Sequence, residues 1–153
     1  METALNSSTA LSTHPFVAGM AEEHIQRLSQ FAEPVTFEAD RYLFRAGETA
    51  TRFYLVSKGR VAIEIFDASR GPVSVQTVEA PSVVGWSWLV PPYRWCFDAR
   101  ALTPVEAVAL DTEKLRAFCH EDHDFGYDFL KRCIVIFAER LYASRFQLLD
   151  MLA

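Results

Sequence analysis

Apolar residues recur at helical spacing near the start of the chain. Ile25, Leu28 and Phe31 lie three residues apart within the segment 21–31, which predicts a short amphipathic helix. Two glutamates in its first turn favour the positive end of the helix dipole. Pro34 is expected to end this helix, because proline cannot continue one.

From residue 35 onward the apolar period falls from helical to strand spacing. Val61, Ile63 and Ile65 alternate with small or charged residues, so we expect them on one face of a strand. Lys58-Gly59, between two such strands, predicts a tight hairpin. Short, evenly spaced strands are typical of an antiparallel β-roll or jelly roll with flanking helices, a mainly β (α+β) fold, rather than of βαβ units. Further strands are predicted at 42–44, 53–57, 73–78 and 105–110, with a longer turn at 67–72.

Two helical segments follow the last predicted strand. Asp111 or Thr112 can cap a helix through Phe118, and a longer helix is predicted from about residue 125 to 152. Its apolar positions follow alternating steps of four and three, with Ser144 in one slot, which is the pattern of a coiled-coil seam. We expect a homodimer formed through this helix, with packing on its own roll as the alternative. The seam residues are Leu130, Ile134, Phe137, Leu141, Leu148 and Met151.

Length and charge limit the class of protein. A chain of 153 residues fits one domain, which we divide into a polar, mobile tail at 1–13, a roll with flanking helices at 14–124, and the long helix at 125–153. With 15 basic and 20 acidic residues, the net charge of −5 argues against a free-standing nucleic-acid binder. No apolar run approaches the ~20 residues that span a bilayer, so no membrane contact is expected.

The residues that could hold metals or do catalysis are few. Cys96, Cys119 and Cys133 are odd in number and widely spaced, which is typical of reduced thiols in a cytoplasmic protein. His120 and His123 lie in an acidic stretch and could share a helix face as metal ligands. A polar connector whose acidic residues cap the next helix is the simpler interpretation, so no metal is predicted. Haem with Cys96 or a histidine as axial ligand is a minor alternative. No catalytic motif stands out, so we do not expect an enzyme, and the cofactor is left open.

One segment resembles a known family. Residues 46–61 read Ala-Gly-Glu-Thr-Ala-Thr-Arg-Phe-Tyr-Leu-Val-Ser-Lys-Gly-Arg-Val, which is similar to the Gly-Glu-x-Ala-x-x-x-Tyr-x-Ile/Leu-x-x-Gly-x-Val signature of cyclic-nucleotide-binding domains. Gly47 and Gly59 take its turn positions, where a positive φ favours glycine. The resemblance implies a β-roll followed by a long helix, with a small-molecule ligand in the roll.

The resemblance is weaker where the family binds its ligand. There the phosphate-binding cassette reads Gly-Glu, a short helix, then Arg-Ser/Thr-Ala; the glutamate takes the ribose hydroxyl and the arginine holds the cyclic phosphate. Here Gly85 opens the cassette, Trp86 stands at the glutamate position, and Trp95 or Cys96 falls near the arginine position. Because a buried hydroxyl loses free energy without its partner, ordinary cyclic AMP is not the expected ligand.

Two arginines nearby offer partial substitutes for the missing anchors. Arg94 lies one residue before the family arginine and is a candidate anion ligand, or else a solvated or stacked side chain. Arg100 lies two residues from Asp98 on a strand, so the two side chains share a face. The simpler interpretation of Arg100 is an ion pair with Asp98.

Aromatic residues replace the anchors. All three tryptophans fall within ten residues, beside Tyr93 and Pro91-Pro92, and the prolines are expected to disfavour the family's short helix. Three interpretations remain: a preformed aromatic pocket for a planar or apolar ligand, a plug that closes the old pocket, or a partner-binding surface. The candidate pocket residues are Gly85, Trp86, Ser87, Trp88, Tyr93, Arg94, Trp95, Cys96 and Arg100.

These observations favour a stand-alone sensor that binds a small molecule, with a nucleotide-like ligand as one option, and that signals through its C-terminal helix. A ligand-free adaptor with a plugged pocket, binding another protein, is the first alternative. In regulators of the catabolite-activator type the long helix leads into a DNA-reading domain, and no such segment follows residue 152. The sensor half of a transcription regulator is therefore the alternative if the sequence is part of a longer chain.

Overall fold

The computed structural model describes residues 9–152. The chain divides after Arg116 into two compact units, 1–116 and 117–153, and each is described by itself.

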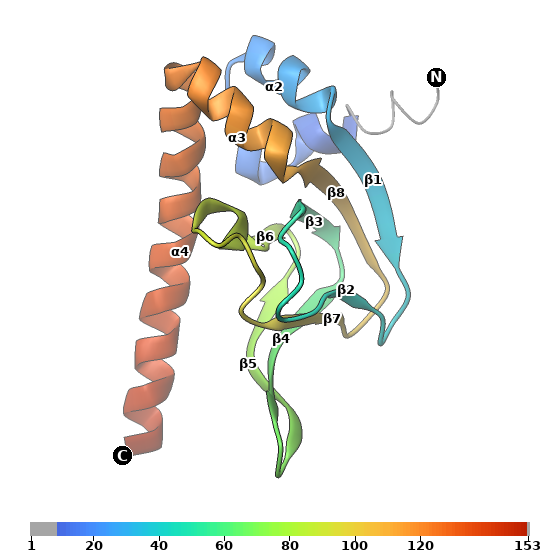
Figure 1. Cartoon of the computed structure of the whole chain (residues 1–153), viewed down its shortest axis with the longest axis vertical. Coiled ribbons are helices and arrows are strands. Elements are labelled where there is room, and N and C mark those ends of the chain that lie inside the picture. The colour runs from blue at the N-terminus through green and yellow to red at the C-terminus, as the bar shows by residue number, and fades with distance from the viewer. Residues whose placement is uncertain (1–8, 153) are drawn as a thin grey trace. The chain divides into compact units, whose positions relative to one another are not determined.

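The first unit is built from two four-stranded antiparallel sheets (Figure 1). The first sheet has the order β1-β8-β3-β6 and the second the order β2-β7-β4-β5, which confirms the predicted antiparallel roll. The strands are β1 (Ala32–Phe37), β2 (Tyr42–Phe44), β3 (Arg52–Lys58), β4 (Arg60–Asp67), β5 (Gly71–Glu79), β6 (Ser82–Val84), β7 (Asp98–Ala101) and β8 (Val105–Asp111).

Short helices flank the roll. They are η1 (Pro15–Val17), α2 (Glu22–Ser29), η2 (Trp86–Leu89) and α3 (Thr112–Glu121). Asp111 caps α3, since the backbone N–H of Lys114 donates to its carboxylate at 3.1 Å, as predicted. Pro34 does not end α2: the helix ends at Ser29, and Pro34 pairs with Val108 inside β1. Because β1 is an edge strand, it tolerates a residue without an N–H donor.

The ordered part begins earlier than predicted. Of the expected tail at 1–13, residues 1–8 lie outside the described part, whereas residues 9–13 are helical and Leu11 is buried. His14 follows and is also buried. Its Nε2 lies 2.8 Å from the carbonyl oxygen of Val56, and the N–H of Phe16 donates to its Nδ1. Leu11 and His14 therefore anchor the start of the described chain to the roll.

Two strand predictions are wrong in detail. Lys58-Gly59 is not a hairpin, because β3 and β4 belong to different sheets. Gly59 instead turns the corner between the sheets at φ 99°, where a Cβ would collide with the carbonyl oxygen of Pro104. In β4 the pairing with β5 shifts register after Ile63. The extra residue is Val75 of β5, and β4 pairs with β7 without a shift from Val61 to Glu64. Along β4, Glu64 is buried and Ile65 is exposed, so the predicted apolar face does not extend to Ile65.

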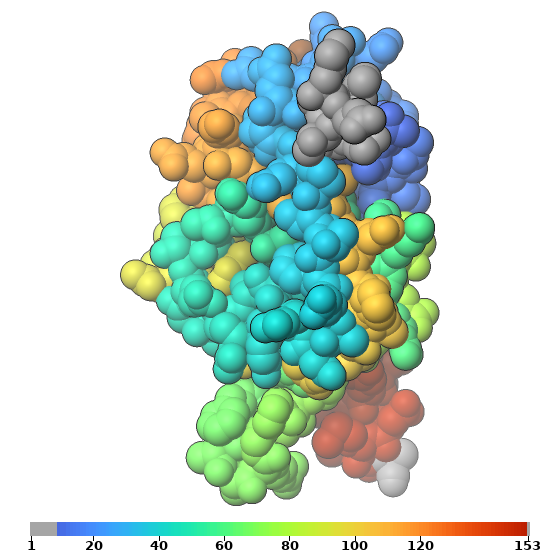
Figure 2. All heavy atoms as spheres, turned by 90° about the vertical axis from the view of Figure 1, so that its right-hand side faces the viewer, coloured from blue at the N-terminus to red at the C-terminus, as the bar shows by residue number. Residues whose placement is uncertain are grey.

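The β4–β5 hairpin projects beyond the rest of the first unit (Figures 1 and 2). Its turn at 67–71 is held by Asp67, whose carboxylate accepts from the backbone N–H and hydroxyl of Ser69, as the turn prediction required. Phe66 near the tip is exposed. The tip of the hairpin thus carries little of the core, whereas its base contributes Val61, Ala62 and Val78.

The second unit contains the end of α3 and all of α4 (His123–Leu152), close to the predicted long helix. Phe118 and Phe125 stack with ring centroids 3.7 Å apart, and Gly126 lies against the backbone of Cys119, where a Cβ would be 2.8 Å from the carbonyl oxygen. No helix among residues 9–152 has the length and apolarity needed to cross a membrane.

Candidate functional site

The candidate cassette begins at the end of β6 with Gly85. Gly85 has φ 99° and ψ 67° and forms the N-cap of η2, a conformation that favours glycine. A Cβ there would lie 2.8 Å from Cη2 of Trp95. The expectation that the prolines prevent a short helix is wrong, because η2 ends at Leu89, before Pro91.

A backbone ladder fastens the second half of the cassette to the 47–50 loop. The N–H of Ala50 donates to the carbonyl oxygen of Tyr93 at 2.7 Å, that of Trp95 to Glu48 at 2.9 Å, and that of Gly47 to Trp95 at 2.8 Å. The loop that carries the Gly-Glu signature therefore positions the cassette segment that stands where the family has its arginine. The position of Trp95 is fixed by the hydrogen bonds of its backbone N–H and carbonyl groups to this loop.

Trp95 begins a column of aromatic rings inside the first unit. It is only 5% exposed and stacks on Phe44, with ring centroids 3.7 Å apart and planes 13° from parallel. Phe44 faces Tyr54 at 6.4 Å, and Phe37 meets Tyr54 edge-on at 5.8 Å. These four residues, the aromatic column, come from the cassette, β2, β3 and β1. Burial raises the pKa of Tyr54, so its hydroxyl stays protonated.

The other two tryptophans have different surroundings. Trp88 is fully buried and lies against Phe53 at 5.7 Å between ring centroids. Trp86, at the position of the family glutamate, is 39% exposed. Within the cassette, Ser87 is buried as well, and Cys96 is exposed.

Arg116 on α3 connects to the cassette, although nothing in the sequence marks it. Its Nη1 donates to the carbonyl oxygen of Trp88 at 3.0 Å, and its guanidinium lies 4.3 Å from the ring centre of Tyr93. Tyr93 has a positive φ of 58°, uncommon for a residue with a side chain. A cation over an aromatic face is attractive, so Arg116 stabilises this turn.

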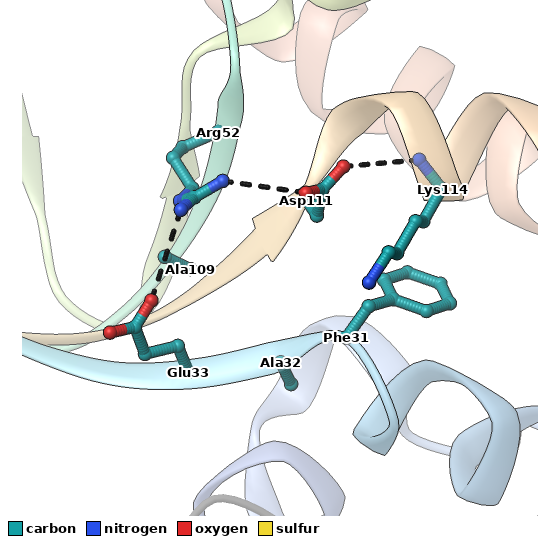
Figure 3. A pocket seen from close by; sticks show the side chains of 7 residues that line it. All are labelled: Phe31, Ala32, Glu33, Arg52, Ala109, Asp111 and Lys114. Atoms are coloured by element: carbon teal, nitrogen blue, oxygen red, sulfur yellow. Dashed lines mark hydrogen bonds and ion pairs between the residues drawn. The ribbon is translucent and has the colours of Figure 1, made fainter.

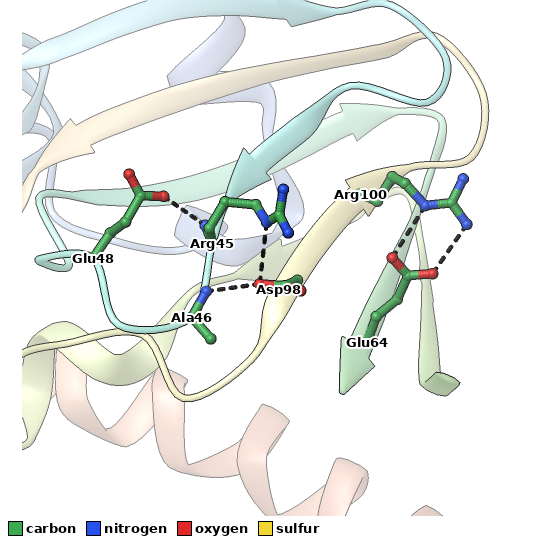
Figure 4. Close-up of polar contacts among 6 residues, drawn as sticks. All are labelled: Arg45, Ala46, Glu48, Glu64, Asp98 and Arg100. Atoms are coloured by element: carbon green, nitrogen blue, oxygen red, sulfur yellow. Dashed lines mark hydrogen bonds and ion pairs between the residues drawn. The ribbon is translucent and has the colours of Figure 1, made fainter. Parts of the chain in front are cut away.

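The charged residues near the cassette form hydrogen bonds and ion pairs with other residues of the same chain (Figure 4). Arg100 donates to both carboxylate oxygens of Glu64, at 3.1 and 3.0 Å, and to Asp40 at 2.8 Å. The hydrogen bonds to Glu64 raise the pKa of Arg100. The predicted pair with Asp98 is wrong, because the Asp98 carboxylate accepts from the N–H of Ala46 at 2.7 Å. Arg100 is the partner of Ala62 across β7 and β4, so Glu64, two residues further along β4, lies on the same face and takes Arg100 instead.

Arg94 points to the signature loop. Its Nη1 donates to the carbonyl oxygen of Gly47 at 2.9 Å, and the side chain is exposed. The same loop is tightened by Glu48, whose carboxylate accepts from the N–H of Arg45 at 2.9 Å (Figure 4). Arg94 and Glu48 thus stabilise the loop conformation on which the cassette rests.

The cysteines and the acidic connector have plain structural surroundings. Burial raises the pKa of Cys119 to about 11 and that of Cys133 to about 12, so both are protonated thiols. Asp122 accepts from the N–H of Phe125 at 3.1 Å, which is the helix cap expected of a polar connector. Among residues 9–152, no group of three or more His, Cys, Asp or Glu side chains is placed to hold a metal ion.

A pocket of about 200 Å³, lined by none of the cassette residues, lies at the end of the first sheet where β1 and β3 begin and β8 ends (Figure 3). Arg52 stands between two carboxylates, 3.6 Å from Asp111 and 3.9 Å from Glu33, and Lys114 reaches in from α3. No sequence motif pointed to these residues, since the fold alone brings them together. The pocket is lined by Phe31, Ala32, Glu33, Arg52, Ala109, Asp111 and Lys114.

The comparisons with known proteins agree with this architecture. The sequence model of the cyclic nucleotide-binding domain matches residues 34–122. A putative cyclic nucleotide-binding protein from Geobacter metallireducens superposes with a TM-score of 0.77 at 24% identity, over 88% of this chain and 98% of that one. A cyclic nucleotide-binding domain from Methylobacillus flagellatus gives 0.78 at 15%, over 97% and 83%.

A larger protein contains the same fold as a part. The cAMP-binding acyltransferase from Mycobacterium smegmatis superposes with a TM-score of 0.74 at 22% identity, over 94% of this chain but 43% of that one. At such identities the solved structures establish the fold alone. No curated protein sequence matches the chain significantly.

Proposed function

We propose that this chain, which belongs to the cyclic nucleotide-binding domain family, is a regulatory domain that works without cyclic AMP and acts on other chains through its C-terminal helix. The burial of Trp95 carries the first half of this proposal. Exposed apolar residues along α4 support the second half.

Trp95 argues against the family's way of binding a nucleotide. It stacks on Phe44 at 3.7 Å and lies against Gly85, at the place where relatives are expected to bring an arginine to the cyclic phosphate. An indole supplies no charge to a phosphate, whereas guanidinium groups bind it with charge-assisted hydrogen bonds. Trp86 likewise offers no acceptor to a ribose hydroxyl. The plugged interpretation of the aromatic cluster therefore fits the geometry better than a preformed empty pocket.

The neighbouring arginines do not compensate for this loss. Arg100 is held by Glu64 and Asp40, and a phosphate would have to displace two carboxylates from it. Arg94 binds the carbonyl oxygen of Gly47 and is exposed. An arginine in water gains little from an ion pair, so neither side chain is a strong phosphate anchor.

The C-terminal helix supplies a surface for a second copy. Ile134, Leu141, Leu148 and Met151 of the predicted seam are each half or more exposed. Further large apolar residues of α4 are exposed outside the seam: Val135, Tyr142, Phe146, Leu149 and Leu152. Patches of this kind mark interaction sites, which supports a homodimer formed through α4.

Thermal unfolding with cyclic nucleotides tests the first half. A ligand bound at micromolar Kd and present at 1 mM stabilises a protein by about 4 kcal/mol, which raises Tm by roughly 8–16 °C for a chain of this size. We expect no shift with 1 mM cyclic AMP or cyclic GMP. A saturable shift of several degrees with either nucleotide would contradict the proposal.

Light scattering tests the second half. Each chain weighs 17.4 kDa, so a dimer weighs about twice that. Leu141→Lys with Leu148→Lys should give a monomer, while Ala143→Lys with Asp150→Lys, also seven residues apart but on the opposite side of the same helix, should leave the dimer intact. A monomeric wild type would remove this half of the proposal.

A small-molecule sensor remains the second candidate, favoured by one observation. Trp86 is the exposed tryptophan of the cassette, and Arg94 of the same segment is exposed as well. A planar anion could stack on the one and pair with the other. Quenching of tryptophan fluorescence by such a ligand in the wild type, but not in Trp86→Ala, would favour this function over the plugged module.

A further inference from the structure

The pocket at the end of the first sheet has a simple structural origin. Glu33, Ala109 and Tyr54 lie side by side across β1, β8 and β3, and Ala109 is by far the smallest of the three. Arg52 and Asp111 form the next pair of β3 and β8 on the same face of the sheet, two residues further along. A hollow therefore opens over Ala109, with charged side chains around it (Figure 3).

These charges are close but incompletely hydrogen-bonded. Arg52 is 3.6 Å from Asp111 and 3.9 Å from Glu33, beyond the usual length of a direct hydrogen bond. One nitrogen of its guanidinium donates to the carbonyl oxygen of Thr51 at 3.3 Å. Among the described residues, the ammonium group of Lys114 makes no ion pair or hydrogen bond. The charged groups that line the pocket can therefore form further hydrogen bonds with a ligand.

The arrangement of charges selects the class of ligand. Two cations, Arg52 and Lys114, stand with two carboxylates, Glu33 and Asp111. A simple anion would meet the carboxylates and a simple cation would meet the basic groups, so each is partly repelled. A molecule that carries both charges can pair its carboxylate with the cations and its ammonium with the carboxylates.

The volume limits the size of that molecule. About 200 Å³ corresponds to roughly six or seven water molecules, at ~30 Å³ each. This space suits a small amino acid and is small for a whole nucleotide. We propose that the pocket between β1, β3, β8 and the start of α3 is a binding site for a small zwitterion of the free amino acid type, separate from the cassette.

The expected affinity is modest. The side chains of Arg52, Glu33 and Asp111 are between about a third and two-thirds exposed, and water and salt screen exposed charges. We expect a dissociation constant on the order of millimolar, weakened further by added salt.

Amide chemical shifts of the full chain test this site. Titration with L-valine should give saturable shifts at residues 31–33, 52, 109 and 111–114. Isobutyrate and isobutylamine, which resemble L-valine but carry one charge each, should bind at least about fivefold more weakly. Equal binding of all three, or no saturable shift with L-valine, would overturn the proposal.

Variants test whether L-valine binds at this pocket or responds to any change in surface charge. Lys114→Gln and Glu33→Gln should each weaken L-valine about fivefold or more. The matched control lies at the far end of the same strands, where Lys58 and Glu106 form an exposed ion pair at 3.2 Å; Lys58→Gln should change nothing. An equal loss in the control would also refute the site. None of these results depends on whether the cassette binds a nucleotide, so the two proposals succeed or fail separately.

Discussion

Replacing Trp95 by alanine tests whether its ring is part of the core. Phe→Ala and Trp→Ala changes in cores cost about 3–5 kcal/mol. Area gives a similar value: a tryptophan buries on the order of 200 Å², worth roughly 5 kcal/mol at ~25 cal/mol per Å². That second figure is an upper bound, because unfolded chains already bury some apolar surface. We therefore expect Trp95→Ala to lose about 4 kcal/mol of a total between about 5 and 15 kcal/mol.

Urea unfolding followed by circular dichroism measures this loss. With a slope of roughly 2 kcal/mol per molar urea, the midpoint should fall by about 2 M. Trp86→Ala is the matched control, because the same substitution is made in the same cassette at a side chain that is 39% exposed. It should cost less than half as much, about 1–2 kcal/mol.

A small aromatic ligand then distinguishes a plug from a general defect. The Trp95→Ala variant should contain an apolar cavity beside Phe44, and such cavities bind aromatic molecules. Indole should raise the Tm of this variant and leave the wild type unchanged. Equal stability losses in the two alanine variants, together with no effect of indole, would refute the reasoning that Trp95 fills the family's ligand position.

Two further predictions concern buried polar groups. Burial lowers the pKa of His14, so the folded state keeps it neutral while the unfolded chain takes up a proton below about pH 6.5; its stabilising contribution is present above that pH and is lost as the pH falls. The fall in unfolding free energy between pH 7.5 and 5.5 should be smaller in His14→Gln than in the wild type. Arg100→Met leaves the Glu64 carboxylate, whose side chain is 3% exposed, without its partner and should cost about 3–5 kcal/mol. Glu64→Leu in the same chain should recover most of this loss, whereas Arg45→Met, at a mostly exposed side chain, should cost under about 1 kcal/mol.

Sequence patterns predicted the parts of this fold that depend on local periodicity. Alternation identified the strands, and the four-three spacing identified α4, because a strand or helix imposes its period on the residues within it. The cap at Asp111 followed from residue type alone. Such features are encoded within a few neighbouring residues.

The errors occur where distant residues decide. The residue types of Lys58-Gly59 fit a hairpin turn as well as a corner between two sheets. The contact that distinguishes them, between Gly59 and Pro104, involves residues that are distant in sequence. The pairing of β4 with β7 places Glu64 on the same face as Arg100 and thereby sets its partner, and a local segment does not reveal which strands pair. Arg116 has no motif, since its contact with Tyr93 depends on how the cassette folds over α3.

Only the residue replacements in the candidate site could be predicted from the sequence, because its packing depends on distant residues. The loss of the family's glutamate and arginine could be read from the positions of Trp86 and Trp95. Whether the tryptophans leave a pocket or fill it depends on the ring of Phe44 on a strand fifty residues earlier, and only the fold sets that distance. Composition could therefore list the interpretations but could not choose among them.

Gly85 shows how a family residue can be kept while its role changes. In this chain its positive φ and missing Cβ admit the ring of Trp95, whose Cη2 would lie 2.8 Å from a Cβ at this position; keeping this glycine is thus no sign that a nucleotide binds. A double-mutant cycle separates the two reasons for a glycine at this position, the positive φ and the close contact with the Trp95 ring. Gly85→Ala in the wild type meets both the backbone strain and the ring, but in Trp95→Ala it meets the strain alone, about 1–3 kcal/mol. The loss should therefore be larger in the wild type by roughly 1–2 kcal/mol, a coupling expected of residues in contact. Equal losses in the two backgrounds would mean that the ring does not rest on Gly85.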